Sequence, residues 1–434
     1  MNKTRRDFLR NAILGPAGLR AAATGLPASF FTCGFLTEEA MADGPLPGQF
    51  LLFNNHNAGD PLNVNAPGTY DVSGAVHNPQ PGMEETPLQL GSVSTTAAAP
   101  WATLPQWALD RTCFISHRTY QNTHPQHVKV LGLVGAAKNP SGTGSDHFAS
   151  LVAYEIRESL ETLQSEPVTL GGGLTLFAGA VVPKIPPSVL ARVFSPLSGE
   201  LLGLANLRDQ TLDAIHERLR EDGTPAQRTW LDRHAESRET VKKLDEDLVA
   251  RFDSITDNSA NAQISAALTL FMMKVSGVVG IHVPFGGDNH KDAGLATEAS
   301  ETISGIASFR FLFEELQSTG LADQVTFANL GPFGRTFAKD GTEGRDHNLN
   351  HHTMMITGAH VNPGIYGGIK EVETDFGATA IDSVTGQGVE GGDIPEDETL
   401  ESAARTLATI LGVPPARIDA RIEGGKLIEA AVAG

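Results

Sequence analysis

Histidine and aspartate residues gather in two parts of the chain, and their types suit metal chemistry. Of the 14 histidines, four lie in residues 117–147 and six in residues 282–360. The members are His117, His124, His127 and His147, then His282, His290, His347, His351, His352 and His360. Both groups follow expected strands, and open α/β sheets place ligand sites beyond the carboxyl ends of their strands. We therefore expect the two groups to meet in one crevice.

Two Asp/His groups in the second region form a candidate metal site. Asp288 and His290 follow an expected strand that ends at Val283, and Asp346 and His347 come later. Carboxylate oxygen and imidazole nitrogen together suit zinc, manganese or iron. Two such groups and a further histidine exceed the needs of one ion, and they suit two ions that clamp an ester oxygen. The alternative is that these histidines only satisfy hydrogen bonds in loops.

Strands that alternate with helices predict a three-layer α/β/α sandwich with a largely parallel central sheet. The apolar patterns predict strands at 49–53, 113–116, 278–283, 324–330 and 353–357, and helices at 148–163, 264–275, 297–319 and 400–411. Residues 74–105 are rich in Gly, Pro, Ser and Thr and predict a surface loop. A charged segment at about 197–260 predicts a helical insertion into a single domain that covers residues 43–434.

The first 42 residues have the form of a twin-arginine signal peptide. Arg5 and Arg6 stand in the string Thr-Arg-Arg-Asp-Phe-Leu-Arg, and Ala40-Met41-Ala42 has the pattern of a cleavage site. The apolar stretch between them is broken by glycine, proline and arginine, so we expect no transmembrane anchor. These features predict a periplasmic or extracellular protein that the twin-arginine machinery exports. The alternative is a cytosolic chain with a chance Arg-Arg pair.

The composition restricts the classes of function. Lys+Arg number 32 against 51 Asp+Glu, a net charge of −19, which disfavours a nucleic-acid-binding face. A substrate with negative charges would need a local positive centre, which a metal ion supplies. The 2 cysteines are too few for a disulfide framework or a thiolate zinc site.

Four motifs occur in an order and spacing that resemble a known family. They are Gly287-Asp288-Asn289-His290, Phe333-Gly334-Arg335-Thr336, Gly344-Arg345-Asp346-His347 and the run from Gly358 to Gly368. Together they resemble the domain-of-unknown-function family 1501 (DUF1501), an exported branch of the alkaline-phosphatase-like superfamily. The resemblance also covers the first strand with Asp60 and the helix near the carboxyl end of the chain.

The resemblance implies a set of site residues in an alkaline-phosphatase-like fold. One ion would bind Asp288, His290 and either His351 or His352, and a second would bind Asp346, His347 and Asp60. The ions would be zinc or manganese, with magnesium and calcium as alternatives. Thr123 would be the nucleophile, with Ser116 as the competing choice, and Arg335 would grip an ester oxygen or form a surface salt bridge.

The expected activity is hydrolysis of a phosphate or sulfate ester on a small molecule or a polysaccharide. Two departures from the family pattern leave a second function open. Pro332 replaces a glutamate, and Pro125 follows His124 in place of an aromatic residue. The alternative is a non-catalytic, metal-stabilised protein of the same fold that binds a partner or assembles in the cell envelope.

Overall fold

The computed structural model describes most of the chain from residue 48 onward. The described residues are 48–53, 59–119, 122–124, 147–162, 164–172, 175–177, 180–194, a few residues between 210 and 228, 246–338 and 343–433. The expected signal peptide and most of the expected helical insertion lie outside them. The described residues of 186–258 form one compact unit, and the other described residues form a second.

A seven-stranded sheet forms the centre of the larger unit, in the order β13-β4-β12-β9-β1-β8-β5. The strands are β1 (Gln49–Phe53), β4 (Thr112–His117), β5 (Val168–Thr169), β8 (Val278–Ile281), β9 (Val325–Asn329), β12 (His352–Thr357) and β13 (Gly364–Tyr366). All pairs are parallel except those of β12, which runs antiparallel to β4 and β9. The prediction of a largely parallel sheet is therefore confirmed.

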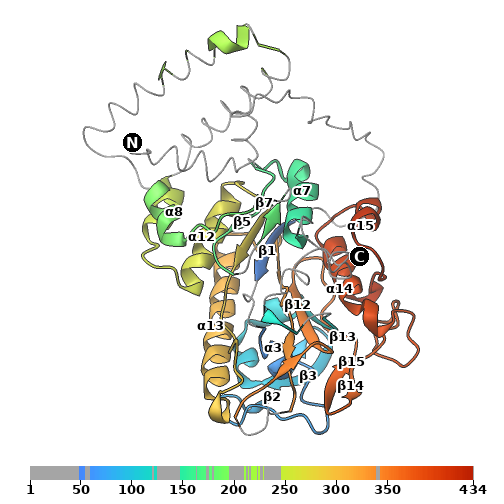
Figure 1. The fold of residues 1–434 in the computed structure, drawn as a ribbon. Helices are drawn as coiled ribbons and strands as arrows, with labels where there is room; N and C mark the ends of the chain where they lie inside the picture. The colour runs from blue at the N-terminus through green and yellow to red at the C-terminus, as the bar shows by residue number, and fades with distance from the viewer. Residues whose placement is uncertain are drawn as a thin grey trace. The chain divides into compact units, whose positions relative to one another are not determined.

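Helices cover both faces of the sheet because its strands are apolar on both sides. They include α7 (Phe148–Leu160), α12 (Ala260–Met272), α13 (Ala296–Ser318), α14 (Thr399–Ile410) and α15 (Pro415–Arg421). Phe53 packs on Phe309 of α13, and Phe50, from the opposite face of β1, packs on Phe148 of α7. Helix α14 joins the core cluster on the α7 side, through residues such as Leu407. Figure 1 shows α13 and α14 on opposite sides of the sheet.

The predicted surface loop at 74–105 is wrong in part, because it contains a regular hairpin. Strands β2 (Glu85–Leu90) and β3 (Val93–Ala98) pair antiparallel around the two-residue turn Gly91-Ser92. A short 3-10 helix, η3 (Ala99–Thr103), follows and carries the buried Trp101 against Phe114. The remaining short elements are α3 (Leu62–Asn65), α4 (Gln106–Leu109), β6 (Leu176–Phe177), β7 (Ala180–Val181), β10 (Gly334–Arg335), β11 (His347–Asn348), η5 (Ala293–Leu295), β14 (Ile369–Val372), β15 (Asp375–Ala378), η6 (Glu396–Glu398) and η7 (Glu429–Ala431).

The smaller unit is helical where the structure describes it. It contains α8 (Pro187–Phe194) and α11 (Glu246–Asp253). The backbone N–H of Ser188 donates to Asn258 Oδ1 at 3.0 Å, which ties the start of α8 to the end of the unit. No described helix in the chain combines the length and the apolar character that a bilayer crossing requires.

Candidate metal centre

The topology brings four loops to one edge of the sheet. Strands β1, β4, β8 and β9 run in the same direction, so the loops that follow them meet at their carboxyl ends. Strand β12 runs the other way and begins at this edge, where His352 pairs with His117 at the end of β4. The two histidine-rich regions of the sequence therefore do converge.

Four side chains at this edge could hold a metal ion. They are His124, Asp288, His290 and His347, and one potential ligand atom from each lies within 4.8 Å of the others. The Nε2 atoms of His290 and His347 lie 2.9 Å apart. Asp288 Oδ1 lies 3.5 Å from His290 Nε2, and Asp288 Oδ2 lies 3.6 Å from His124 Nε2. For ligands about 2.1 Å from a tetrahedral zinc ion, separations of this order are expected.

The hydrogen-bond partners of His290 and His347 fix which nitrogen carries the proton. The Nδ1–H of His347 donates to the carbonyl oxygen of Asn122, which leaves a lone pair on Nε2. Arg335 Nη1 donates to His290 Nε2 at 3.3 Å, so this nitrogen also carries a lone pair. Burial and the nearby Arg335 lower the pKa of His347, which disfavours an imidazolium there. Both Nε2 atoms are therefore unprotonated acceptors, and with a carboxylate beside them they form a donor set that suits a metal ion. A bound cation would replace Arg335 as the partner of His290 Nε2.

Arg335 and Asp346 flank the four donors. Arg335 Nη2 donates to Asp288 Oδ1 at 3.2 Å, and the arginine side chain is fully buried. Burial lowers its pKa, and the charges of Asp288, Asp60 and Asp346 partly offset this effect. Asp346 Oδ1 lies 3.6 Å from His290 Nδ1 and accepts the backbone N–H of His347. Both residues therefore orient donors. The full burial of Arg335 shows that the alternative of a surface salt bridge is wrong, whereas its grip on an ester oxygen stays a prediction.

A buried ion pair connects the two donor loops, which are the loop that carries Asp288 and His290 and the loop that carries Asp346 and His347. Arg345 Nε donates to Glu298 Oε2 at 2.7 Å, and both side chains are fully buried. Asn289 Nδ2 donates to the same oxygen at 2.9 Å. Arg345 precedes Asp346, and Asn289 lies between Asp288 and His290. Glu298 thus links both ligand-bearing loops to the first turn of α13.

The other expected metal ligands lie outside this group of four. Asp60 Oδ2 lies 3.6 Å from His352 Nε2, and both side chains are buried. A Cβ atom on Gly331 would lie 2.7 Å from that nitrogen, so the backbone approaches this pair closely. Burial, with the neighbouring His352, lowers the pKa of His117 to about 3. His351 points to the opposite face of the sheet, where its Nε2 lies 3.3 Å from Ser116 Oγ.

The structure places the two candidate nucleophiles differently. Thr123 is exposed and directly precedes the donor His124. Ser116 is buried in β4 and contacts His351 rather than the four donors. Thr123 is therefore the hydroxyl that lies next to a donor in the chain.

Sequence reasoning missed some of the residues that build this centre. His124 was expected only as the neighbour of the nucleophile Thr123 and not as a metal ligand. Its place in a histidine-rich segment could have indicated that it is a potential ligand. Arg345 stands within one of the motifs, but no pattern in the sequence marks Glu298 as its partner 47 residues away.

The comparison with known families bears on these motifs. Residues 207–383 match the family described as "Protein of unknown function (DUF1501)". This match confirms the resemblance to DUF1501. The matched segment includes Asp288, His290, Arg335, Asp346 and His347, and ends before α14. No curated protein matches the chain.

Proposed function

We propose that this protein is an exported, metal-dependent hydrolase of phosphate or sulfate esters with an alkaline-phosphatase-like fold. The observation that carries the proposal is the set of four converging donors, in which the Nε2 atoms of His290 and His347 are both unprotonated and lie 2.9 Å apart. The mostly parallel sheet, with the donors at its carboxyl ends, also supports it.

The residues around the donors have roles that suit ester hydrolysis. A bound divalent cation would activate a hydroxyl or a water and stabilise charge on the ester oxygens. Asp288, His124, His290 and His347 would hold it, and Arg335 and Asp346 would orient Asp288 and His290. The side chain of Asp288 is 53% exposed, so a substrate from solvent can reach this side of the centre. Thr123 is the proposed nucleophile.

A second cation is part of the proposal. Asp60 and His352 present a carboxylate oxygen and an imidazole nitrogen 3.6 Å apart in a buried position. Zinc and manganese both accept carboxylate oxygen and imidazole nitrogen as ligands. Metal analysis of the purified protein should therefore give two equivalents of zinc or manganese. A single equivalent would restrict the site to the four converging donors.

One observation favours the non-catalytic alternative. Structural zinc sites use four protein ligands, whereas catalytic zinc sites keep one position open for water. Three imidazoles and one carboxylate converge here, which is a complete tetrahedral set. A metal-stabilised protein that binds a partner or assembles in the cell envelope would need no more than this.

Hydrolysis and metal content, measured together, separate the two functions. We expect the full chain to hydrolyse a chromogenic phosphate or sulfate ester. His347→Ala and Asp288→Asn should lower both metal content and rate, the rate by about 100-fold or more. His360→Ala is the matched control, because His360 follows β12 at the opposite edge of the sheet, and it should change neither quantity. Bound metal without turnover of either ester would support the alternative.

The nucleophile can be tested in the same assay. Thr123→Ala should abolish turnover without loss of metal, because its hydroxyl is proposed to attack the ester. Ser116→Ala should leave turnover within about twofold, because Ser116 lies on the other face of β4. The reverse result would assign the attack to Ser116.

Export is proposed from the first 42 residues, which lie outside the described part of the chain. Fusion of residues 1–42 to a folded reporter should deliver it beyond the inner membrane through the twin-arginine machinery. Arg5→Lys with Arg6→Lys should abolish delivery, and a reporter that stays in the cytosol with the native sequence would contradict the proposal.

A further inference from the structure

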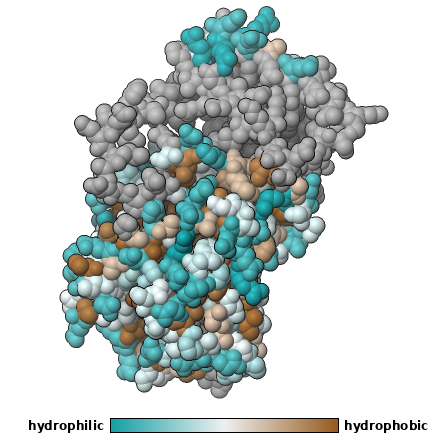
Figure 2. Space-filling model, turned by 180° about the vertical axis from the view of Figure 1, so that it is seen from behind, coloured by the Kyte–Doolittle hydropathy of each residue, from teal (hydrophilic) through white to brown (hydrophobic). Residues whose placement is uncertain are grey.

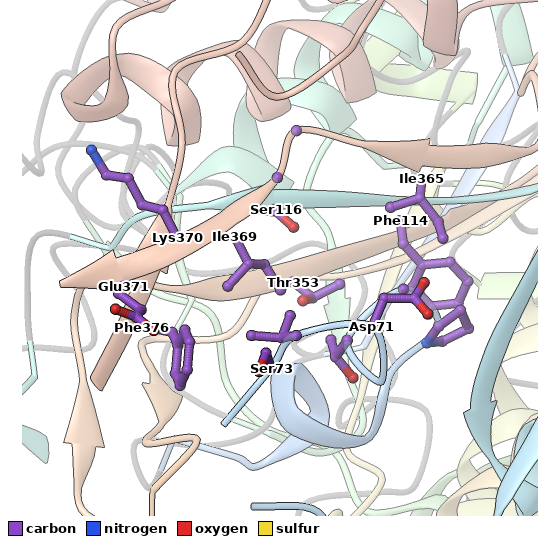
Figure 3. Close-up of a pocket in the computed structure, with 16 residues that line it drawn as sticks. Asp71, Ser73, Phe114, Ser116, Thr353, Ile365, Ile369, Lys370, Glu371 and Phe376 are labelled. Atoms are coloured by element: carbon purple, nitrogen blue, oxygen red, sulfur yellow. The ribbon is translucent and has the colours of Figure 1, made fainter. Parts of the chain in front are cut away.

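A cavity of about 410 Å³ lies on the sheet face opposite His117 and His352. Its floor is formed by Ser116 of β4 and Thr353 of β12, which pair with each other in register. The segment 67–73 forms one wall, and β13 and β14 with Phe376 form the other. In Figure 3 the hydroxyls of Ser116 and Thr353 lie between these walls.

The proton of the Ser116 hydroxyl is available to the cavity. Asn63 is held in one orientation, because its Oδ1 accepts the N–H of Arg335 and its Nδ2 donates to the carbonyl of Arg335. Its Nδ2 also faces His351 Nδ1 at 3.4 Å, which must then accept. His351 therefore carries its proton on Nε2 and donates it to Ser116 Oγ at 3.3 Å. The same tautomer prevents His351 from accepting the serine proton.

Thr353 adds a second hydroxyl to the floor. Its side chain is buried, with 2% exposed, and Oγ1 finds no hydrogen-bond partner among the described residues. A buried hydroxyl without a partner costs free energy unless something binds it. Thr353 lines the cavity, but its Oγ1 is itself buried from solvent, so a ligand in the cavity would satisfy this hydroxyl after a rotation of the side chain about χ1.

The walls and the rim restrict the chemistry of the ligand. Phe114, Ile365 and Phe376 provide apolar surface. The rim carries the exposed carboxylates of Asp71 and Glu371. Lys370 also lies at the rim, but it forms an ion pair with Glu396 and extends away from the cavity in Figure 3. The rim is therefore negative, which disfavours an anionic ligand.

We propose that this cavity binds a neutral sugar residue. The two floor hydroxyls would hydrogen-bond its oxygens, the carboxylates at the rim would accept from its hydroxyls, and the aromatic and aliphatic walls would cover its C–H face. Small-molecule sites have volumes of roughly 300–1,000 Å³, a range that includes this cavity. The site is separate from the metal centre and does not depend on the proposed hydrolysis.

Calorimetric titration of the full chain with methyl glycosides of neutral hexoses and with glucuronate tests the site. We expect at least one neutral glycoside to bind, and glucuronate to bind more weakly because of the acidic rim. Thr353→Val keeps the shape of the side chain and removes the hydroxyl, so it should weaken binding about fivefold. Ser116→Ala should weaken binding by a similar factor.

Thr302→Val is the matched control. Thr302 Oγ1 is also buried without a hydrogen-bond partner among the described residues, but it lies on α13 and not in the cavity. This variant should bind the sugar as the wild type does, and unfolding in urea shows that each variant is folded. The proposal is overturned if no neutral glycoside binds, if glucuronate binds as tightly, or if Thr302→Val weakens binding as much as Thr353→Val.

Discussion

At the scale of single residues, the centre depends on groups that hold the donors rather than on the donors alone. The Asn122 carbonyl fixes the tautomer of His347, and Arg335 directs Asp288 and the lone pair of His290. Such partners of metal-binding residues set the orientation and the basicity of the ligands. Changes at these positions should therefore alter metal affinity without removing a ligand.

Glu298→Gln tests the support behind the two donor loops. The substitution leaves the buried Arg345 guanidinium without its counter-charge, so we expect the free energy of unfolding to fall by about 3–5 kcal/mol. Metal affinity should fall as well, because Asn289 loses a charged partner. Glu314→Gln on the same helix is the control. Glu314 forms an exposed pair with Arg310 and should cost about 0.5 kcal/mol or less. Equal losses in urea denaturation would contradict the supporting role.

Asp375 gives a pH dependence of stability with a defined sign. Burial raises its pKa to about 6, although the backbone N–H groups of Ala338 and Phe337 donate to it. The folded chain then binds a proton between about pH 4 and 6 that the unfolded chain has released. The stability that this proton contributes is complete at low pH and is lost as the pH rises through 6. Asp375→Asn cannot titrate, so the difference in unfolding free energy between wild type and variant should change from pH 4.5 to pH 7. A constant difference would show that Asp375 does not titrate in this range.

At the scale of elements, Gly91 shows why the β2–β3 hairpin forms where a loop was expected. Its φ is 54°, and a Cβ atom there would lie 2.3 Å from Pro363 Cγ. Gly91→Ala should therefore lower the free energy of unfolding by about 2–4 kcal/mol, from backbone strain and the steric clash together. Gly320 also has a positive φ, of 72°, but open space around it, so Gly320→Ala should cost only about 1 kcal/mol. Urea denaturation of the two variants measures the difference, and equal costs would rule out the contact with Pro363.

The strands and helices of the core could be predicted because the pattern of apolar residues within each element is enough to identify it. The apolar run at β1 and the periodicity at α13 lie within a residue or two of their predicted bounds. The hairpin was missed because the Ser, Thr and Gly content of residues 85–98 also suits a loop, and only its pairing makes it a sheet. In the same way, motifs identified Asp288 and His290, but the approach of His124 and the Glu298–Arg345 pair depend on contacts between distant segments.

At the scale of the whole molecule, acidic residues outnumber basic ones. The chain has a net charge of −19. On the face that Figure 2 shows, hydrophilic side chains of the described residues separate small groups of hydrophobic ones. A net charge of this size favours solubility. In a chain with this excess of negative charge, a cation bound where the donor loops meet would be a local centre of positive charge.

Removal of metal should therefore lower the stability of the larger unit as a whole. A cation at the four donors would connect residues 124, 288 and 347, which lie far apart in the sequence but at one edge of the sheet. A ligand that binds only the folded state, at 100 times its dissociation constant, stabilises that state by about 2.7 kcal/mol. We expect a chelator to lower the unfolding temperature of the wild type, and added zinc or manganese to restore it. Asp288→Asn should unfold at the lower temperature with or without chelator, because it lacks a donor. A chelator effect of the same size in Asp288→Asn would place the stabilising ion elsewhere.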